Sequence, residues 1–352
     1  MKAFVIQKPN ELVCQEVPLP TPAPDEALVR VSYAGLCATD LAIYSGDMSL
    51  VRNGSIQYPV RFGHEWSGVV EAVGSNVIGI QPGDRVISES GVTCGVCEAC
   101  QKQDWAACKN VKSLGTINCW DGAFAEYVHM PVRHLHKIPE NVSLKEAAVV
   151  EPTCIALAGV KKANITEGKT VLVIGTGAIG LASVALAKYY GAERVFLSGR
   201  TDSKLAIGRE MGADCCINTK NTSLVDAIMQ ETHGHGVDAV IETSGNINTI
   251  SDLLMCAGNG AYISLIGFYE KTVPAFLIDE IVMKSLHVNG VMGEFGMPAE
   301  VLGILKSEKF SLLPLITHVI PFEKTIEAME SPEAFEGRVK LLVEVSSEEK
   351  TN

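Results

Sequence analysis

Four cysteines within a short stretch of the chain carry the strongest chemical signal in the sequence. Cys94, Cys97 and Cys100 are each separated by two residues, and Cys108 follows shortly afterwards. Four thiolates this close together can surround one tetrahedral zinc ion and leave no position open, which predicts a structural zinc site. An iron–sulfur cluster is the rival interpretation. In a long chain whose first residues lack the pattern of a secretory signal, such clustering favours a metal over disulfide bonds.

A second set of ligand-type side chains is spread along the first half of the chain. Cys37 stands alone, His64 and Glu65 are adjacent, and Glu151 lies much further on. A thiolate, an imidazole and a carboxylate would suit a catalytic zinc, which takes three protein ligands and keeps one position for water or substrate. Spacing alone leaves this set open, because a buried cysteine is more often just a small apolar side chain.

A glycine-rich turn lies between an apolar segment at 170–174 and a helix expected from about residue 178 to 190. The turn reads Gly175-Thr176-Gly177-Ala178-Ile179-Gly180. After a strand and before a helix, this glycine spacing is the context of a dinucleotide site. The glycines allow a tight turn, close approach of a pyrophosphate and close helix–strand packing. The helix N-terminus adds free N–H groups and a partial positive charge.

The end of the next expected strand indicates which dinucleotide binds. Sites for NAD usually carry an acidic residue there, to bond the ribose 2′-hydroxyl. This chain has Ser198-Gly199-Arg200, with no carboxylate to repel a 2′-phosphate. Arg200 can pair with that phosphate and Ser198 can add a hydroxyl. The sequence therefore favours NADP as the cofactor, with NAD as the alternative. The other interpretation of Arg200 is that it is an ordinary solvated charge on the surface.

The chain changes character near residue 153. The first 150 residues are expected to form short strands and turns interrupted by prolines. From there to about residue 290, strand-like runs alternate with helical patterns, which predicts a parallel sheet covered on both faces. The length of 352 residues also favours two domains. We expect residues 1–152 and 291–352 to form one domain and residues 153–290 the other.

Composition excludes several classes of function. The net charge of −12 and the absence of clustered Lys and Arg argue against nucleic acid as a partner. The hydrophobic fraction of 47% is that of a globular chain, yet no apolar run reaches the length of about 20 residues that a membrane span needs. We therefore expect a cytoplasmic protein with a small-molecule partner.

Read together, these motifs resemble the zinc-containing medium-chain alcohol dehydrogenase family, and most of all its polyol and threonine dehydrogenase branch. The resemblance covers nearly the whole chain and rests on the order of its motifs: Gly63-His64-Glu65, Gly68, Gly74, Pro82 to Val86, the four cysteines, Asp121 to Tyr127, Glu151-Pro152, the glycine turn and Pro314 to His318. It implies a doubly wound Rossmann domain for the cofactor and a mostly β, GroES-like catalytic domain.

The resemblance also implies roles for individual residues. Cys37 and His64 would bind a catalytic zinc, with Glu65 as the steadier and Glu151 as the competing third ligand. Thr39 would lie beside the reacting oxygen and pass its proton onward. Further positions match residues that touch the cofactor in relatives: Ile179, Gly199, Arg200, Lys204, Ile266, Gly267, Phe268, Val291 and Met292.

Two positions depart from the family pattern. One is Gly199, where relatives that use NAD carry an acidic residue, and this departure favours NADP. At the other, relatives often carry a histidine five residues after the zinc-binding cysteine, where this chain has Ala42. The proton relay must then end at Tyr44, at water or at Glu151. This difference weakens a specific assignment to threonine.

The sequence hypothesis is a dehydrogenase with two zinc ions per chain that moves a hydride between a nicotinamide cofactor and a polyol, sugar alcohol or related secondary alcohol. The alternatives are a threonine-type amino-alcohol dehydrogenase, a zinc-free reductase of the same fold, and a non-catalytic cofactor-binding protein. Apolar segments at 261–266 and 286–291 are expected at the edge of the cofactor sheet, where an uncovered strand needs a partner. We therefore expect a homodimer or homotetramer.

Overall fold

The computed structural model describes residues 1–272, 276–293 and 295–346. The described chain divides into two compact units. Unit 1 contains residues 1–151, 298–307 and the chain from 316 onward, and unit 2 contains residues 152–297 and 308–315.

Unit 2 is a parallel α/β sheet, as the alternating pattern predicts. Its six strands lie in the order β12-β11-β10-β13-β14-β15, and neighbouring strands pair in parallel. The strands are β10 (Thr170–Ile174), β11 (Arg194–Gly199), β12 (Cys215–Asn218), β13 (Val237–Glu242), β14 (Ala257–Leu265) and β15 (His287–Gly290). The helices are α5 (Val150–Lys162), which begins in unit 1, α6 (Ala178–Tyr189), α7 (Asp202–Glu210), α8 (Leu224–Glu231), α9 (Thr249–Cys256) and α10 (Ile278–Met283), with a short turn η3 (Leu313–Leu315).

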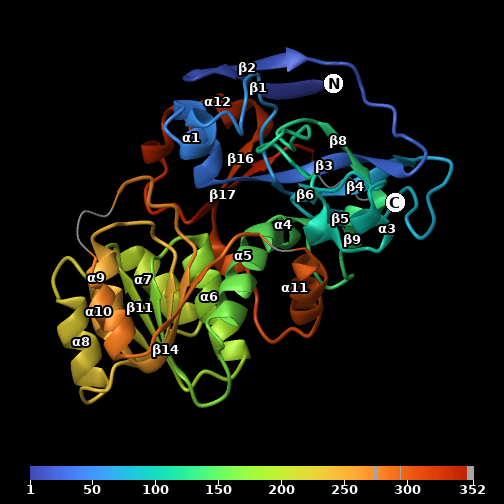
Figure 1. Cartoon of the computed structure of the whole chain (residues 1–352). Helices are drawn as coiled ribbons and strands as arrows, with labels where there is room; N and C mark the ends of the chain where they lie inside the picture. Colours follow the sequence, from blue (N-terminus) through green and yellow to red (C-terminus); the bar gives the residue numbers. More distant parts are fainter. Residues whose placement is uncertain (273–275, 294, 347–352) are drawn as a thin grey trace. The chain divides into compact units, whose positions relative to one another are not determined.

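The strand order reverses between β10 and β13. Crossovers in parallel sheets are right-handed, so the reversal places helices on both faces of the sheet. Figure 1 shows α8, α9 and α10 gathered together at one side of unit 2, where their apolar residues join the buried side chains of β10, β13 and β14. The doubly wound fold expected for the cofactor domain is thus confirmed.

Unit 1 is built around a mixed sheet in the order β16-β17-β3-β4-β5-β9, with β8 also pairing with β3. The sheet strands are β3 (Glu26–Leu36), β4 (Glu65–Val73), β5 (Arg85–Ser88), β8 (Tyr127–Pro131), β9 (Leu135–Lys137), β16 (Ile316–Pro321) and β17 (Lys340–Glu344). Smaller pairs are β1 (Lys2–Lys8) with β2 (Glu11–Glu16) and β6 (Gly91–Val92) with β7 (Lys112–Ser113). The helices are α1 (Ala38–Ser45), α2 (Ser49–Arg52), α3 (Glu98–Gln101), α4 (Leu144–Ala147), α11 (Met297–Lys306), which begins in unit 2, and α12 (Thr325–Glu330).

The core of unit 1 lies where residues from both ends of the chain meet. Val29 and Val31 of β3 are fully buried with Leu341 and Val343 of β17, which joins the sheet by antiparallel pairing with β3. Alternation along β3 turns one set of its side chains into this core. The mostly β character expected for this part of the chain is confirmed.

Apart from a one-residue difference at Pro152, the boundaries of the units differ from the expected ones in two places. Residues 291–297 belong to unit 2, where the Val291 N–H extends the sheet by donating to Leu265 O at 2.9 Å. Residues 308–315 also belong to unit 2, because Phe310 packs edge-on against Tyr189 of α6 with 6.2 Å between ring centroids. Among the described residues, no helix has the length and apolar content that crossing a membrane requires.

The central strand of unit 2 should tolerate shape changes poorly. Leu172 of β10 is fully buried, so Leu172→Ala should lower the free energy of unfolding by about 2–5 kcal/mol through lost burial and a cavity. Leu172→Met, which keeps the volume, should cost less than about 1.5 kcal/mol. Thermal and denaturant unfolding of both variants measures this. Equal losses in the two variants would contradict the packing described for β10.

Candidate functional site

Two neighbouring strands of unit 1, β3 and β4, bring Cys37, His64 and Glu65 together. Cys37 follows directly after β3, and Glu65 opens β4 opposite Gly35 of β3. One ligand atom each from Cys37, His64 and Glu65 lies within 4.8 Å of the others. Cys37 is far in the sequence from the adjacent His64 and Glu65, and the pairing of β3 with β4 makes them neighbours.

Asp40 lies behind this group and is completely buried. Its Oδ2 accepts the Cys37 N–H at 2.9 Å, which caps the start of α1, and its Oδ1 lies 3.6 Å from His64 Nδ1. Both Asp40 Oδ1 and His64 Nδ1 are buried without a hydrogen-bond partner among the described residues. A carboxylate on the outer nitrogen of an imidazole is the usual support of a metal-binding histidine.

Charge dominates the chemistry of His64. Burial opposes the charged imidazole, but the Asp40 carboxylate and the Cys37 side chain outweigh it and raise the pKa of His64 well above its ordinary value. For Asp40, burial raises the pKa of the carboxyl to about 6, although the charge of His64 opposes this shift. Such a concentration of negative ligands around one imidazole is suited to a cation.

Glu65 is 1% exposed and is held by a buried lysine. Lys340 Nζ donates to both carboxylate oxygens, at 2.7 and 2.6 Å, and reaches Leu36 O at 3.3 Å. Burial lowers the pKa of the Lys340 ammonium, but the Glu65 carboxylate outweighs burial and raises it. A Cβ on Gly35 would lie 2.4 Å from Glu65 Oε2, so only glycine leaves room for this carboxylate.

Glu151 and Thr39, the other two residues predicted for this site, are not part of the group of three ligand atoms. Glu151, at the start of α5, lies outside the group of three ligand atoms but acts on His64 and Glu65 by charge. Burial raises the pKa of its carboxyl to about 7. Thr39 lies in the first turn of α1, two residues after Cys37, and is partly exposed.

The four-cysteine segment forms a separate group in unit 1. The sulfurs of Cys94, Cys97, Cys100 and Cys108 lie within 4.8 Å of one another, and no disulfide joins them. The backbone N–H groups of Val96 and Cys97 lower the pKa of the Cys94 thiol to about 6. Four sulfurs with N–H donors around them fit a metal that binds thiolates.

The glycine turn of unit 2 has the local geometry that its sequence predicts. Gly175 has a φ of 112°, and a Cβ there would lie 2.5 Å from Thr243 Oγ1. A Cβ on Gly180 would lie 2.0 Å from Gly175 O, so helix α6 packs directly against the turn. Gly177 is the N-cap of α6 and is exposed, with open space where a Cβ would be. The turn thus leaves the helix N-terminus accessible to an anion.

The other predicted cofactor residues lie after the carboxyl ends of neighbouring strands. Ser198 is buried at the end of β11, Gly199 packs against Thr176 of the glycine turn, and Arg200 is exposed. Residues 266–268 follow β14 and residues 291 and 292 follow β15, whereas Lys204 is on α7. In parallel sheets this edge is where ligands bind.

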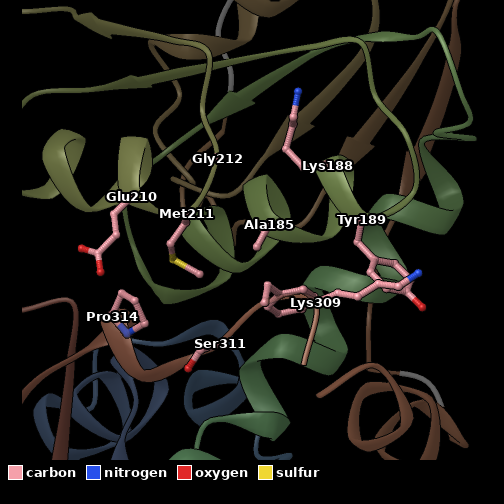
Figure 2. A pocket seen from close by; sticks show the side chains of 10 residues that line it. Ala185, Lys188, Tyr189, Glu210, Met211, Gly212, Lys309, Ser311 and Pro314 are labelled. Atoms are coloured by element: carbon pink, nitrogen blue, oxygen red, sulfur yellow. The ribbon is translucent and has the colours of Figure 1, made fainter. Parts of the chain in front are cut away.

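A cavity of about 720 Å³ in unit 2 does not coincide with this edge. Figure 2 shows its lining, which includes Tyr189 of α6, Met211 and Lys309. None of its lining residues is among those predicted to bind the cofactor. The cavity therefore adds nothing to the candidate site.

Sequence reasoning missed three polar residues that the structure places at these sites. Asp40 and Lys340 belong to the group around Cys37, and Glu242 is buried at the end of β13. Each had a signal, namely a charged residue next to or within an apolar run, as in Val339-Lys340-Leu341. A charge in such a run is either exposed or paired, and one sequence does not say which.

Two family models match the chain. Residues 23–140 match the alcohol dehydrogenase GroES-like domain, and residues 178–306 match the zinc-binding dehydrogenase domain. The two matched segments correspond to the main parts of units 1 and 2.

Curated relatives and solved structures extend over almost the whole chain. An L-threonine 3-dehydrogenase from Bacillus velezensis is 34% identical, covering 93% of this chain and 94% of that protein. A sorbitol dehydrogenase from Bacillus subtilis is 30% identical, with 97% of each chain covered. The crystal structure of a protein from Sinorhizobium meliloti 1021, described as a zinc-binding dehydrogenase and bound to NADP, has a TM-score of 0.89 and 29% identity, covering 98% of this chain and 99% of that one.

These matches agree with the arrangement of the candidate site. The fold of both units, the thiolate–imidazole–carboxylate group and the glycine turn occur in one chain, in the order that the resemblance requires. The chain belongs to the zinc-binding medium-chain alcohol dehydrogenase family, in its polyol and threonine branch, and is an NAD(P)-dependent oxidoreductase acting on CH–OH groups.

Proposed function

We propose that the protein oxidises a polyol, sugar alcohol or related secondary alcohol, using a metal centre formed by Cys37, His64 and Glu65. The observation that carries this proposal is the convergence of the three ligand atoms within 4.8 Å, with the buried Asp40 behind His64. Hydrophobic packing does not explain such a group, because burying these three polar side chains without a bound metal costs free energy.

A zinc ion held there would supply a Lewis acid that polarises the alcohol or carbonyl oxygen. The chain's own residues would do the rest. Asp40 would orient His64 through Nδ1, and Lys340 would hold Glu65 in place. The Thr39 hydroxyl would carry the alcohol proton away. Ala42 offers no acceptor, so the proton would continue to Tyr44, to water or to Glu151.

We also propose that each chain carries two zinc ions. The second would be bound by the sulfurs of Cys94, Cys97, Cys100 and Cys108 and would stabilise the surrounding loop without taking part in chemistry.

L-Threonine is the second candidate substrate. It is favoured by the 34% identity to an L-threonine 3-dehydrogenase and disfavoured by Ala42 at the relay position. Oxidation of a polyol panel and of L-threonine by one preparation would decide between them. Turnover with sorbitol-type polyols exceeding that with L-threonine supports the proposal, and the reverse order replaces it with the threonine function.

Removing the thiolate of the proposed catalytic site should remove one zinc and the activity. Cys37→Ala should lower the zinc content from two ions per chain to one and reduce kcat/KM by more than about 100-fold, because the metal centre loses a ligand. Elemental analysis and steady-state kinetics measure both. Cys119→Ser is the matched control, since Cys119 is partly buried in the same unit but outside both groups. An unchanged zinc content in Cys37→Ala would contradict the proposed site.

We propose NADP as the preferred cofactor, with Arg200 pairing with its 2′-phosphate. Gly199 leaves no carboxylate at the end of β11, and the exposed Arg200 follows it. The Sinorhizobium structure, at 29% identity, is an example of a chain of this fold that binds NADP.

Arg200→Ala should reduce kcat/KM for NADP by about 10- to 100-fold, the range expected for losing a charge-assisted hydrogen bond. The value for NAD should change by less than about twofold. Arg209→Ala, on the exposed end of α7, is the control for a general loss of positive charge. Parallel losses with both cofactors would show that Arg200 does not read the 2′-phosphate.

We propose that two copies of the chain associate through β15, the outer strand of the unit 2 sheet. Val288 on β15 is 39% exposed, and Ile278, Val282 and Met283 of the preceding helix are 60%, 72% and 68% exposed. An apolar edge strand with unpaired backbone groups needs a cover, and a second β15 would provide one.

Val288→Lys should therefore convert an oligomer into a monomer, because the charge would be buried at the interface. Light scattering at micromolar concentration gives the mass of each variant. Val319→Lys is the control, since Val319 is 40% exposed on β16, the outer strand of the other sheet. A parent protein that is already monomeric, or an unchanged mass in Val288→Lys, would contradict the interface.

A further inference from the structure

Glu242 is a completely buried carboxylate at the carboxyl end of β13, and it binds two loops at once. Its Oε1 accepts the Ser244 N–H at 2.8 Å and the Ser244 hydroxyl. Its Oε2 accepts the Gly245 N–H at 3.2 Å and the Tyr269 hydroxyl at 2.9 Å. Ser244 and Gly245 follow β13, whereas Tyr269 follows β14, so one side chain joins the two loops.

The two loops are pressed together with little space between them. A Cβ on Gly267 would lie 2.2 Å from Gly245 N, and a Cβ on Gly245 would lie 2.4 Å from Phe268 O. The backbone of Glu242 adds to the connection, because its carbonyl accepts the Ile266 N–H at 2.9 Å. The positions of residues 266–268 therefore depend directly on Glu242.

The first loop is also in contact with the glycine turn. Thr243 N and Thr243 Oγ1 both donate to Ile174 O at 2.9 Å, and Thr243 Oγ1 is the atom that a Cβ on Gly175 would meet. The connected loops thus lie on the β13 side of β10, whereas Arg200 lies on the β11 side. A dinucleotide bound across this strand-order reversal places its adenosine half on the β11 side and its nicotinamide half on the other.

We propose that Glu242 is a positioning residue for the cofactor, which fixes the two loops that hold the nicotinamide half. This inference rests on the proposed cofactor site. Because Glu242 has no exposed surface, it would act on the cofactor through Gly245 and residues 266–268.

The geometry requires a carboxylate at this position. The two carboxyl oxygens of Glu242 are placed as acceptors, and here they meet four donors. Burial, followed by the charge of Glu242, raises the pKa of Tyr269, so its hydroxyl remains a donor. A glutamine would turn its NH₂ group toward at least one backbone N–H, and the loops would have to separate.

Asp238 provides a matched control on the same strand. It lies near the amino end of β13, where its Oδ2 accepts the Thr170 N–H at 2.9 Å and the Thr170 hydroxyl at 2.8 Å. It therefore joins two chain segments as Glu242 does, but at the end of the sheet away from the glycine turn. Asp238→Asn should weaken the structure of unit 2 without changing cofactor binding.

The test compares the affinities of parent, Glu242→Gln and Asp238→Asn for NADPH, NADH and ADP, measured by titration well below the unfolding temperature of each variant. In Glu242→Gln the Kd of the tighter-binding dinucleotide should rise by about tenfold or more, the effect of a buried donor left unpaired. The Kd of ADP, which contains only the adenosine half and the pyrophosphate, should change by less than about twofold. Asp238→Asn should change neither value.

The outcomes separate this inference from the proposed function. A parent that binds neither NADPH nor NADH would refute the cofactor site and the inference together. A parent that binds, with Glu242→Gln within twofold of it or with ADP weakened equally, would refute the inference alone. If Glu242→Gln does not fold, Tyr269→Phe takes its place: it should raise the Kd of the dinucleotide and leave that of ADP unchanged, and an unaltered dinucleotide Kd would refute the role of Glu242.

Discussion

Glu65 and Lys340 are 1% and 4% exposed, and each is tolerated inside unit 1 because the other is present. A single charge in such surroundings costs several kcal/mol, so the pair holds three strands to one register. Leu341 of β17 lies opposite Leu36 of β3, and Gly35 of β3 lies opposite Glu65. A slip of one residue would turn these side chains to the other face of the sheet and scatter the ligand group around Cys37.

Local patterns predicted the parts of the site whose residues are close together in the sequence. Three patterns of this kind are the four cysteines, the turn from Gly175 to Gly180, and the alternation of strands and helices after residue 153. The structure has a group of four sulfurs, a turn before α6 and a parallel sheet at the positions that these patterns predict. Cys37, His64 and Glu65 were different. Their spacing in the sequence does not indicate a common site. In the sequence analysis only the resemblance to a family grouped them, and in the structure the pairing of β3 with β4 brings them together.

The residues that were missed act over long sequence distances or through burial. Lys340 reaches Glu65 across 275 positions, and Glu242 joins its own strand end to Tyr269. A sequence pattern shows that these charges stand beside apolar residues, but the identity of the partner depends on which strands become neighbours. The domain boundary was displaced for a similar reason, since residues 308–315 pack on α6 although the chain on either side belongs to unit 1.

The interleaving of the two units has a consequence for the order in which the protein is made. Synthesis runs from the N-terminus, so all of unit 2 is made before β17, the strand that carries Lys340. Domains generally fold as units during synthesis, and unit 2 has its six strands available first. Glu65 therefore has no ion-pair partner until Lys340 has been synthesised. The surroundings of Cys37, the first ligand of the group to be translated, are therefore among the last parts of the molecule to be completed.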